Sequence, residues 1–318
     1  MKSILITGGT GFIGSNLCNY LYQRGYKIFA FDNNLRGKRS RLNKNIKFIH
    51  GDIRFIKNLN KCKKFKIDAV VHLAYINGTK FFYSKPELVL DVAVKGLINI
   101  FDFCIKNKIK NLFLASSSEV YQTPLKIPTT EKEPIKIPDI ENPRYSYSGG
   151  KILTELYGKN FGKKYFKKLI IFRPHNVYGP DMGNEHVIPE LLKKIKNLKN
   201  NKEIVIEGSG QETRSFIYID EFCRALEILI KKGKHLEIYN IGTEEEVKII
   251  NLVKIISNII NINLKIIKKK LKKGGAKRRC PNISKIRKIG FKNKIKLSDG
   301  LRLIIKDYNK IYSFTKKI

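Results

Sequence analysis

Cysteine is scarce in this chain, which has five cysteines in 318 residues and no Cys-x-x-Cys pair. An odd number of widely spaced cysteines argues against a disulfide framework, and the missing pair argues against a zinc site. The five histidines are also scattered, without metal-ligand spacing. We therefore expect no metal site and five reduced, structural cysteines: Cys18, Cys62, Cys104, Cys223 and Cys280.

Long apolar runs are missing as well. No run approaches the roughly 18 residues that a membrane-spanning helix requires, although hydrophobic residues make up 42% of the chain. Residues 1–3 lead directly into the apolar Ile4-Leu5-Ile6, which leaves no room for a secretory signal peptide. These features predict a cytoplasmic protein that does not associate with membranes.

Acidic residues are few, because 27 Asp and Glu stand against 64 Lys and Arg and give a net charge of +37. Such a charge suggests nucleic acid or another polyanion as a partner. However, the lysines accompany abundant Ile and Asn, a mixture that AT-rich coding DNA favours, and they are not interleaved with aromatics as a base-stacking surface would be. Nucleic acid is therefore not expected, whereas a polyanionic small molecule is compatible with the charge.

The order of apolar segments predicts the fold class. In the first half, short apolar runs alternate with longer amphipathic stretches, a pattern typical of βαβ units and a parallel sheet. After about residue 175 the elements become shorter and glycine separates them. We predict an α/β protein with a Rossmann doubly wound parallel sheet in residues 1–175 and a smaller C-terminal substrate-binding lobe in residues 176–318, packed directly on the sheet.

A glycine-rich loop follows the first predicted strand. It contains Gly8, Gly11 and Gly14, and Phe12 and Ile13 open the helix after it. Glycines at this spacing let the backbone turn tightly and approach a pyrophosphate, whose charge meets free N–H groups at the helix N-terminus. The position between a strand and a helix predicts a dinucleotide-binding loop.

Asp32 ends the second predicted strand about 20 residues after the loop, where a carboxylate binds ribose hydroxyls and repels a 2′-phosphate. This favours NAD over NADP. Asp52 and Ile53 would lie beside the adenine, and Leu73 and Ala74 along the cofactor, although Asp52 could simply cap the following helix. Three basic residues could weaken the preference for NAD: Arg36, Lys38 and Arg39.

Tyr147 and Lys151 are four residues apart, which places a phenol and an ammonium on one face of a helix. A nearby cation can lower the pKa of a phenol, and an activated Tyr can transfer the proton of a sugar hydroxyl beside a hydride acceptor. Ser117, in a serine-rich segment after the fifth strand, can hydrogen-bond a substrate oxygen at the edge where such sheets place their chemistry. A plain serine-rich turn is the alternative interpretation.

These motifs together resemble the extended short-chain dehydrogenase/reductases of the NAD-dependent epimerase/dehydratase family, which act on nucleotide sugars. The resemblance covers nearly the full chain. The segments that carry it are 8–14, Asp32, 51–53, 72–74, 116–121, Tyr147 with Lys151, 173–180, 208–218 and 278–281.

The resemblance implies a role for each matching residue. Tyr147 would remove the proton of the sugar 4-hydroxyl, Lys151 would hold the nicotinamide ribose, and Ser117 would share the hydroxyl's hydrogen bond while hydride passes to NAD. It also implies a homodimer formed through the helix of Tyr147. The residues it places around the nucleotide-diphosphate sugar are Ser118, Asn176, Arg214 and one of Arg278 and Arg279.

The fate of the 4-keto sugar stays open at this stage. Re-reduction makes a 4-epimerase, which needs no further residue and is the preferred outcome, in surface glycan biosynthesis. Glu119 lies where dehydratases and uronate decarboxylases of the family carry an acid, so a 4,6-dehydratase or a UDP-glucuronate decarboxylase is the alternative. The segment 75–83, Ala93 and Gly150 depart from the family pattern and predict an atypical substrate pocket.

Overall fold

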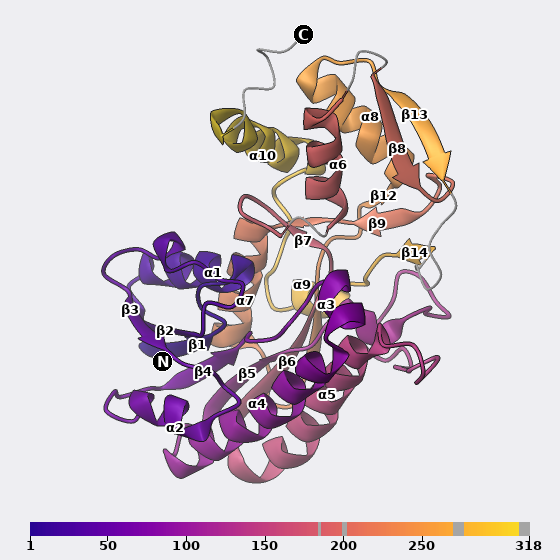
Figure 1. Ribbon diagram of the computed structural model, residues 1–318. Helices are drawn as coiled ribbons and strands as arrows, with labels where there is room; N and C mark the ends of the chain where they lie inside the picture. The colour runs from indigo at the N-terminus through magenta and orange to yellow at the C-terminus, as the bar shows by residue number, and fades with distance from the viewer. Residues whose placement is uncertain (184–185, 199–201, 270–276, 312–318) are drawn as a thin grey trace.

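The computed structural model describes residues 1–183, 186–198, 202–269 and 277–311 of the chain. A seven-stranded sheet forms its centre (Figure 1), and every neighbouring pair of strands is parallel. In spatial order the strands are β11 (Ile238–Ile241), β6 (Lys168–Pro174), β5 (Asn111–Ala115), β4 (Ala69–His72), β1 (Ser3–Thr7), β2 (Lys27–Asp32) and β3 (Lys47–His50). The predicted Rossmann sheet is confirmed.

Helices cover both faces of this sheet, which explains why its central strands are continuous apolar runs. On β1 and β5, residues such as Ile4, Leu5 and Phe113 are fully buried. One face packs against α1 (Phe12–Tyr22) and α7 (Ile219–Lys232). The other face carries α2 (Ile56–Leu59), α4 (Pro86–Lys106) and α5 (Tyr145–Tyr165).

Short elements connect these layers near the carboxyl ends of the strands. They are the 3-10 helices η1 (Arg39–Arg41), η2 (Asn60–Cys62) and η3 (Ser118–Tyr121) and the helix α3 (Thr79–Ser84). α3 and η3 both pack against α5, so the segments after β4 and β5 meet the helix that carries Tyr147.

A second region lies beside the sheet (Figure 1) and is built from smaller sheets and helices. β8 (Glu203–Glu207) pairs with β13 (Lys265–Lys269), and β9 (Thr213–Ser215) lies between β12 (Glu246–Lys248) and β14 (Arg278–Arg279). The remaining elements are β7 (Val177–Tyr178), β10 (Ile217–Tyr218), α6 (Val187–Lys196), α8 (Ile249–Ile260), α9 (Ser284–Arg287) and α10 (Leu297–Ile311). Because β11 is a strand of the large sheet and α7 packs on one face of it, the chain passes between the two regions more than once. A division at residue 175 stays a prediction.

A buried ion pair anchors α5 to the sheet. Arg173 of β6 donates hydrogen bonds of 2.7 and 2.6 Å to the Glu155 carboxylate, and both side chains are less than 5% exposed. Ser116 donates to the same carboxylate at 2.5 Å, and Arg173 also reaches the Tyr121 hydroxyl at 2.6 Å. Since removing one partner of a buried pair strands a charge, this network fixes α5 against the ends of β5 and β6.

Across the described ranges, no helix has the length and apolar character needed to cross a membrane. Within the same ranges no group of three or more His, Cys, Asp or Glu side chains could hold a metal ion. All five cysteines lie in these ranges, where they are buried and unpaired.

Candidate active site

A cleft of about 1040 Å³ lies at the carboxyl ends of the parallel strands, between the sheet and the second region. Most of the residues selected from the sequence line it. They are Gly8, Gly11, Phe12, Ile13, Gly14, Asp32, Asp52, Ile53, Leu73, Ala74, Ser117, Ser118, Glu119, Tyr147, Lys151, Asn176 and Arg279. Arg214 and Arg278 are not part of this lining.

The glycine loop forms a concave backbone surface, a cradle, in which a side chain at Gly8 or Gly14 would collide with the neighbouring backbone. Gly8 has a φ of +71°, and a Cβ on it would lie 2.8 Å from the Ala74 backbone nitrogen. A Cβ on Gly14 would lie 1.9 Å from the Gly8 carbonyl oxygen. Gly11 precedes α1 without a side-chain cap, so first-turn N–H groups are available to an anion. This geometry fits the pyrophosphate of a dinucleotide.

Asp32 lies at the end of β2, and its carboxylate is held by the backbone. It accepts hydrogen bonds from the N–H of Thr10 at 3.0 Å and of Asn34 at 2.8 Å. Each carboxylate oxygen has a second lone pair, so the group can still accept from ribose hydroxyls in the cleft. Its negative charge disfavours a 2′-phosphate there.

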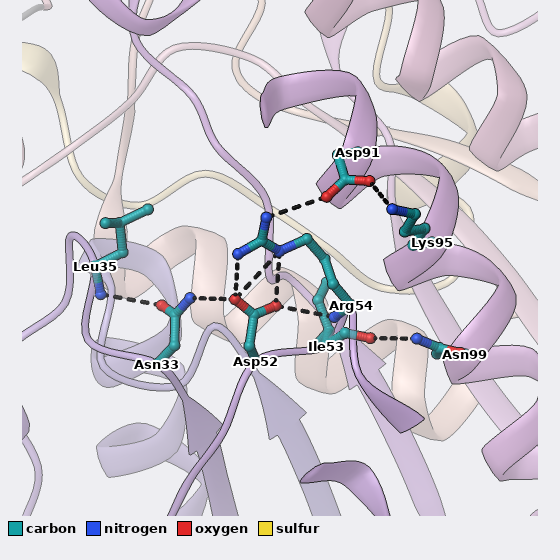
Figure 2. A network of polar contacts seen from close by, with 8 residues as sticks. All are labelled: Asn33, Leu35, Asp52, Ile53, Arg54, Asp91, Lys95 and Asn99. Atoms are coloured by element: carbon teal, nitrogen blue, oxygen red, sulfur yellow. Dashed lines mark hydrogen bonds and ion pairs between the residues drawn. The ribbon is translucent and has the colours of Figure 1, made fainter. Parts of the chain in front are cut away.

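Asp52 takes part in a polar network in the lining of the cleft (Figure 2). Its carboxylate accepts from the Arg54 guanidinium at 2.8 to 3.2 Å and from the Asn33 amide at 3.1 Å, and Arg54 also binds Asp91 at 3.1 Å. Burial opposes ionisation, but the hydrogen bonds from Arg54 and Asn33 hold the pKa of Asp52 below its ordinary value. The N-cap of α2 is Phe55 rather than Asp52, so the carboxylate stiffens this part of the lining instead of capping the helix.

Lys151 projects from α5 into a dry corner of the cleft, where it is 3% exposed. Its Nζ donates to the Ala115 carbonyl at 2.7 Å and lies 3.7 Å from the centre of the Tyr75 ring. Burial lowers the pKa of Lys151 to about 7, although the Glu155 carboxylate opposes the shift. The charged and neutral forms of Lys151 are therefore both populated near neutral pH.

Tyr147 lies in the first turn of α5 and is 7% exposed. Burial raises the pKa of Tyr147 to about 12, a hydrogen bond with Ser117 and the charge of Arg36 lower it, and Glu119 raises it. The expected lowering of this pKa by Lys151 is not met by the side chains alone, because burial outweighs it and Nζ is 5.7 Å from the phenol ring centre. The phenol stays protonated at neutral pH unless another positive charge approaches.

A charged pair, Glu119 with Arg279, lies in the cleft close to Tyr147, on which the Glu119 charge acts. Arg279 binds the Glu119 carboxylate with both terminal nitrogens, Nη2 at 2.9 Å. Burial raises the pKa of Glu119, but the charges of Arg279, Arg144 and Arg214 hold it at about 2. No spacing in the sequence indicates this pair, since its members are 160 residues apart.

Of the adjacent residues Arg278 and Arg279, one lines the cleft and the other does not. Arg279 lines it, whereas the Arg278 side chain is 53% exposed and pairs with Glu246 on the surface at 2.7 Å. Arg214 lies behind the lining, where its Nη1 donates to the Thr213 carbonyl at 2.8 Å. Asn176, with a φ of 38°, donates its amide to the Ser215 carbonyl at 3.0 Å.

Tyr75 and Arg36 are two of the cleft residues that were not selected as site residues from the sequence. Tyr75 packs on Lys151, and its ring lies 5.1 Å from the Tyr147 ring. Arg36 lines the cleft with its guanidinium 5.5 Å from the Phe81 ring centre, and its charge acts on Tyr147. The departures from the family pattern at 75–83, Ala93 and Gly150 were the available signal for Tyr75.

Comparisons with known proteins agree with this geometry. The profile of the NAD dependent epimerase/dehydratase family matches residues 4–242. Human dTDP-D-glucose 4,6-dehydratase is 32% identical over 270 residues, which cover 81% of this chain and 74% of that protein.

Solved structures align over almost the full chain. The UDP-glucose 4-epimerase of Thermotoga maritima with UDP-glucose has a TM-score of 0.89 at 26% identity, covering 97% of this chain and 99% of that one. The UDP-N-acetylglucosamine 4-epimerase of Methanobrevibacter ruminantium, in complex with UDP-N-acetylmuramic acid, has a TM-score of 0.87 at 26% identity, covering 98% and 99%.

The expected family, enzyme class and cofactor are thus confirmed. The glycine cradle, Asp32 and the Tyr147–Lys151 helix lie around one cleft in a fold that these enzymes share. The chain belongs to the NAD dependent epimerase/dehydratase family, and it is an NAD-dependent enzyme of the nucleotide-sugar epimerase/dehydratase type.

Proposed function

We propose that the protein is a nucleotide-sugar 4-epimerase. Tyr147 takes the proton of the sugar 4-hydroxyl, Ser117 hydrogen-bonds the same oxygen, and Lys151 holds the nicotinamide ribose. NAD, when bound, supplies the hydride acceptor and a positively charged ring beside the phenol. The resulting 4-keto sugar takes back a hydride on its other face and the proton from Tyr147.

The observation that supports epimerisation over the alternatives is the ion pair of Glu119 with Arg279. A dehydratase or decarboxylase would use Glu119 to move a proton or polarise a group near C5 and C6. With a pKa of about 2, the Glu119 carboxylate has no proton to donate near neutral pH and is only a weak base, and both of its oxygens already accept hydrogen bonds from Arg279. The epimerase needs only Tyr147, Ser117 and Lys151.

The same charged group supports a nucleotide diphosphate as the bound part of the substrate. Arg279, Arg214 and Arg144 surround one carboxylate, so positive charge is in excess there. Guanidinium groups bind phosphate oxygens through charge-assisted hydrogen bonds. We therefore infer that the diphosphate binds near these arginines and that the sugar extends toward Tyr147, and we assign the enzyme to surface glycan biosynthesis.

The test is a product screen with UDP-, GDP-, CDP- and dTDP-sugars, read by mass and NMR. An epimer of unchanged mass is the expected product. Loss of water from the sugar, or release of carbon dioxide from UDP-glucuronate, would contradict the 4-epimerase and identify a dehydratase or a decarboxylase.

A Glu119→Gln variant separates the candidates further, because Gln keeps the shape but neither ionises nor pairs with Arg279. We expect 4-epimerisation to stay within about tenfold of the wild type, whereas a residue that transfers a proton contributes about 10²–10⁴-fold. Glu141→Gln, at an exposed position outside the cleft, is the matched control.

A decarboxylase is the second candidate, and a specific feature favours it. Glu119 lines the cleft beside Arg279, a residue that a substrate carboxylate would attract as strongly as a phosphate does. If substrate draws Arg279 away, the Glu119 carboxylate is released into the cleft. Retained epimerisation in Glu119→Gln, together with no carbon dioxide from UDP-glucuronate, would exclude this candidate.

We also propose a homodimer, because exposed apolar side chains form a stripe on the surface of α4 and α5, which pack against each other. Leu90, Val94 and Ile98 recur at helical spacing on α4 and are 37–43% exposed, and Leu156 on α5 is 55% exposed. An Ile98→Glu change should shift the sedimenting mass from dimer to monomer, whereas exposed Lys163→Glu should not. A monomeric wild-type protein would refute this.

The buried, unpaired thiols of all five cysteines support a reducing compartment, and we assign the enzyme to the cytoplasm. Fractionation of cells that express the native chain tests this assignment. Recovery with a membrane or secreted fraction would overturn it.

A further inference from the structure

Tyr75 fills a space that two small residues leave open. A Cβ on Gly150 would lie 1.9 Å from the Tyr75 hydroxyl oxygen and 2.6 Å from the Ala93 Cβ. Gly150 belongs to α5 and Ala93 to α4, while Tyr75 comes from the segment after β4. The three departures from the family pattern are therefore one packing arrangement, in which glycine and alanine make room for a phenol.

The ring that enters this space meets the catalytic helix. The Lys151 Nζ lies 3.7 Å from the ring centre, a distance at which an ammonium contacts the π face. The Tyr75 hydroxyl donates to the Tyr147 carbonyl at 3.4 Å, and the two phenol rings meet edge to face at 5.1 Å. Tyr75 thus contacts Lys151 through its ring face and Tyr147 through its hydroxyl and an edge-to-face ring contact.

We propose that Tyr75 is a positioning residue that binds the Lys151 ammonium on its ring face and holds it at the Ala115 carbonyl, with its remaining hydrogens available to the cleft. The proposal rests on the proposed function for what Lys151 does in the reaction. The contact between ring and ammonium does not depend on any substrate.

The surroundings of Lys151 show why a ring can matter. The titratable side chains that act on it are Glu155 of α5, His72 of β4, Tyr147 and Tyr75. Burial lowers the pKa of His72 to about 3, so this imidazole is neutral, and the Glu155 carboxylate is already bound by Arg173. With the pKa of Lys151 near 7, a modest attraction by the ring face changes how much of the lysine is charged.

A fluorination series at position 75 tests the contact with little change of shape. The electron density on the ring face falls step by step along the series from phenylalanine to 4-fluorophenylalanine and 3,4,5-trifluorophenylalanine. The pKa of Lys151 is read in the full chain by competitive labelling with a trace of acetic anhydride and mass spectrometry of the peptide that contains it. Tyr75→Phe should match the wild type, and the fluorinated rings should lower this pKa stepwise by up to about one unit.

No trend across the series would overturn the proposal, because a purely steric role predicts one value for all four rings. Tyr75→Leu, which removes the ring and keeps apolar volume, should lower the pKa of Lys151 at least as far as the trifluoro ring. Phe82→Leu is its matched control, since Phe82 packs on Tyr147 at 5.1 Å and lines the cleft. An equal shift in the Phe82 variant would also overturn the proposal.

The pH profile of turnover separates this proposal from the proposed function. If charged Lys151 is needed, the alkaline limb should move to lower pH in step with the labelling. A stepwise change in labelling without any movement of that limb would support the contact and refute the role that the proposed function gives to Lys151.

Discussion

Two parts of the cleft lining use opposite physical means to set the charge of their key groups. Around Tyr147 and Lys151, in the dry corner, burial dominates and moves both pKa values toward the neutral forms, to about 12 and about 7. At the pair of Glu119 and Arg279, which we call the charged corner, burial also opposes charge, but neighbouring arginines overcome it and hold the pKa of Glu119 at about 2. The dry corner has a protonated phenol and a lysine divided between its charged and neutral forms, whereas the charged corner is permanently ionised.

This difference separates chemistry from binding. A group that exchanges a proton during catalysis needs two accessible protonation states. The dry corner provides an amine near that balance and a phenol that needs a further positive charge to reach it. A group that binds a diphosphate needs fixed charge, and the arginines around Glu119 provide it. The contrast predicts that substitutions in the dry corner act on turnover and that those in the charged corner act on stability and substrate affinity.

Tyr147→Phe should have the largest effect. It keeps the ring packing against Tyr75 and Phe82 and removes only the hydroxyl that exchanges the proton. Turnover should fall by about 10³-fold or more, while thermal stability changes little. The measurement is steady-state turnover with the substrate found in the product screen, beside a melting curve.

Tyr145→Phe is the control for this prediction, because Tyr145 begins the same helix but does not line the cleft. It should leave turnover within about twofold. Equal turnover of Tyr147→Phe and wild type would show that the dry corner does not supply the group that exchanges the proton.

Arg279→Met should have the next largest effect, and on stability. It leaves the Glu119 carboxylate, 24% exposed, without its bidentate partner. Stranding a partly buried charge should cost about 2 kcal/mol of the free energy of unfolding, less than for a fully buried pair. Urea unfolding at neutral pH measures it.

Arg278→Met is the matched control from the adjacent position, where the arginine pairs with Glu246 in solvent. Exposed ion pairs contribute little, so its unfolding midpoint should stay close to that of the wild type. Equal destabilisation by the two changes would contradict the assignment of Arg279 alone to the cleft.

How much the sequence could predict depended on the distance between interacting residues. The glycine loop and the Tyr147–Lys151 pair each lie within one turn or one loop, so their spacing together with their place among the other motifs identified them. The contacts of Glu119 with Arg279 and of Tyr75 with Gly150 join distant segments, and spacing carries no signal for such contacts.

A different reason left the choice between Arg278 and Arg279 open in the sequence analysis. Successive side chains of a strand point to opposite sides, so one of the two on β14 had to face away from the cleft. The sequence did not give the orientation of that strand. Likewise, the sequence shows that the segment 75–83, Ala93 and Gly150 depart from the family pattern. The packed structure is needed to show that all three departures accommodate the Tyr75 side chain.

The smallest predicted effect is on how stability depends on pH, and it distinguishes Lys151 from Glu119. In the folded protein burial lowers the pKa of Lys151 to about 7, against an ordinary 10.5. Between these two values the unfolded chain binds the extra proton, so rising pH favours folding. This term should add about 1 kcal/mol between pH 7 and pH 8. Glu119, whose pKa is lowered from 4.5 to about 2, contributes stability that is instead lost as pH falls through that lower range. Urea titrations of the ligand-free protein should therefore show a smaller alkaline slope in Lys151→Met but not in exposed Lys163→Met, with the acid limb intact in both. An unchanged alkaline slope in Lys151→Met would mean that the folded protein holds Lys151 charged.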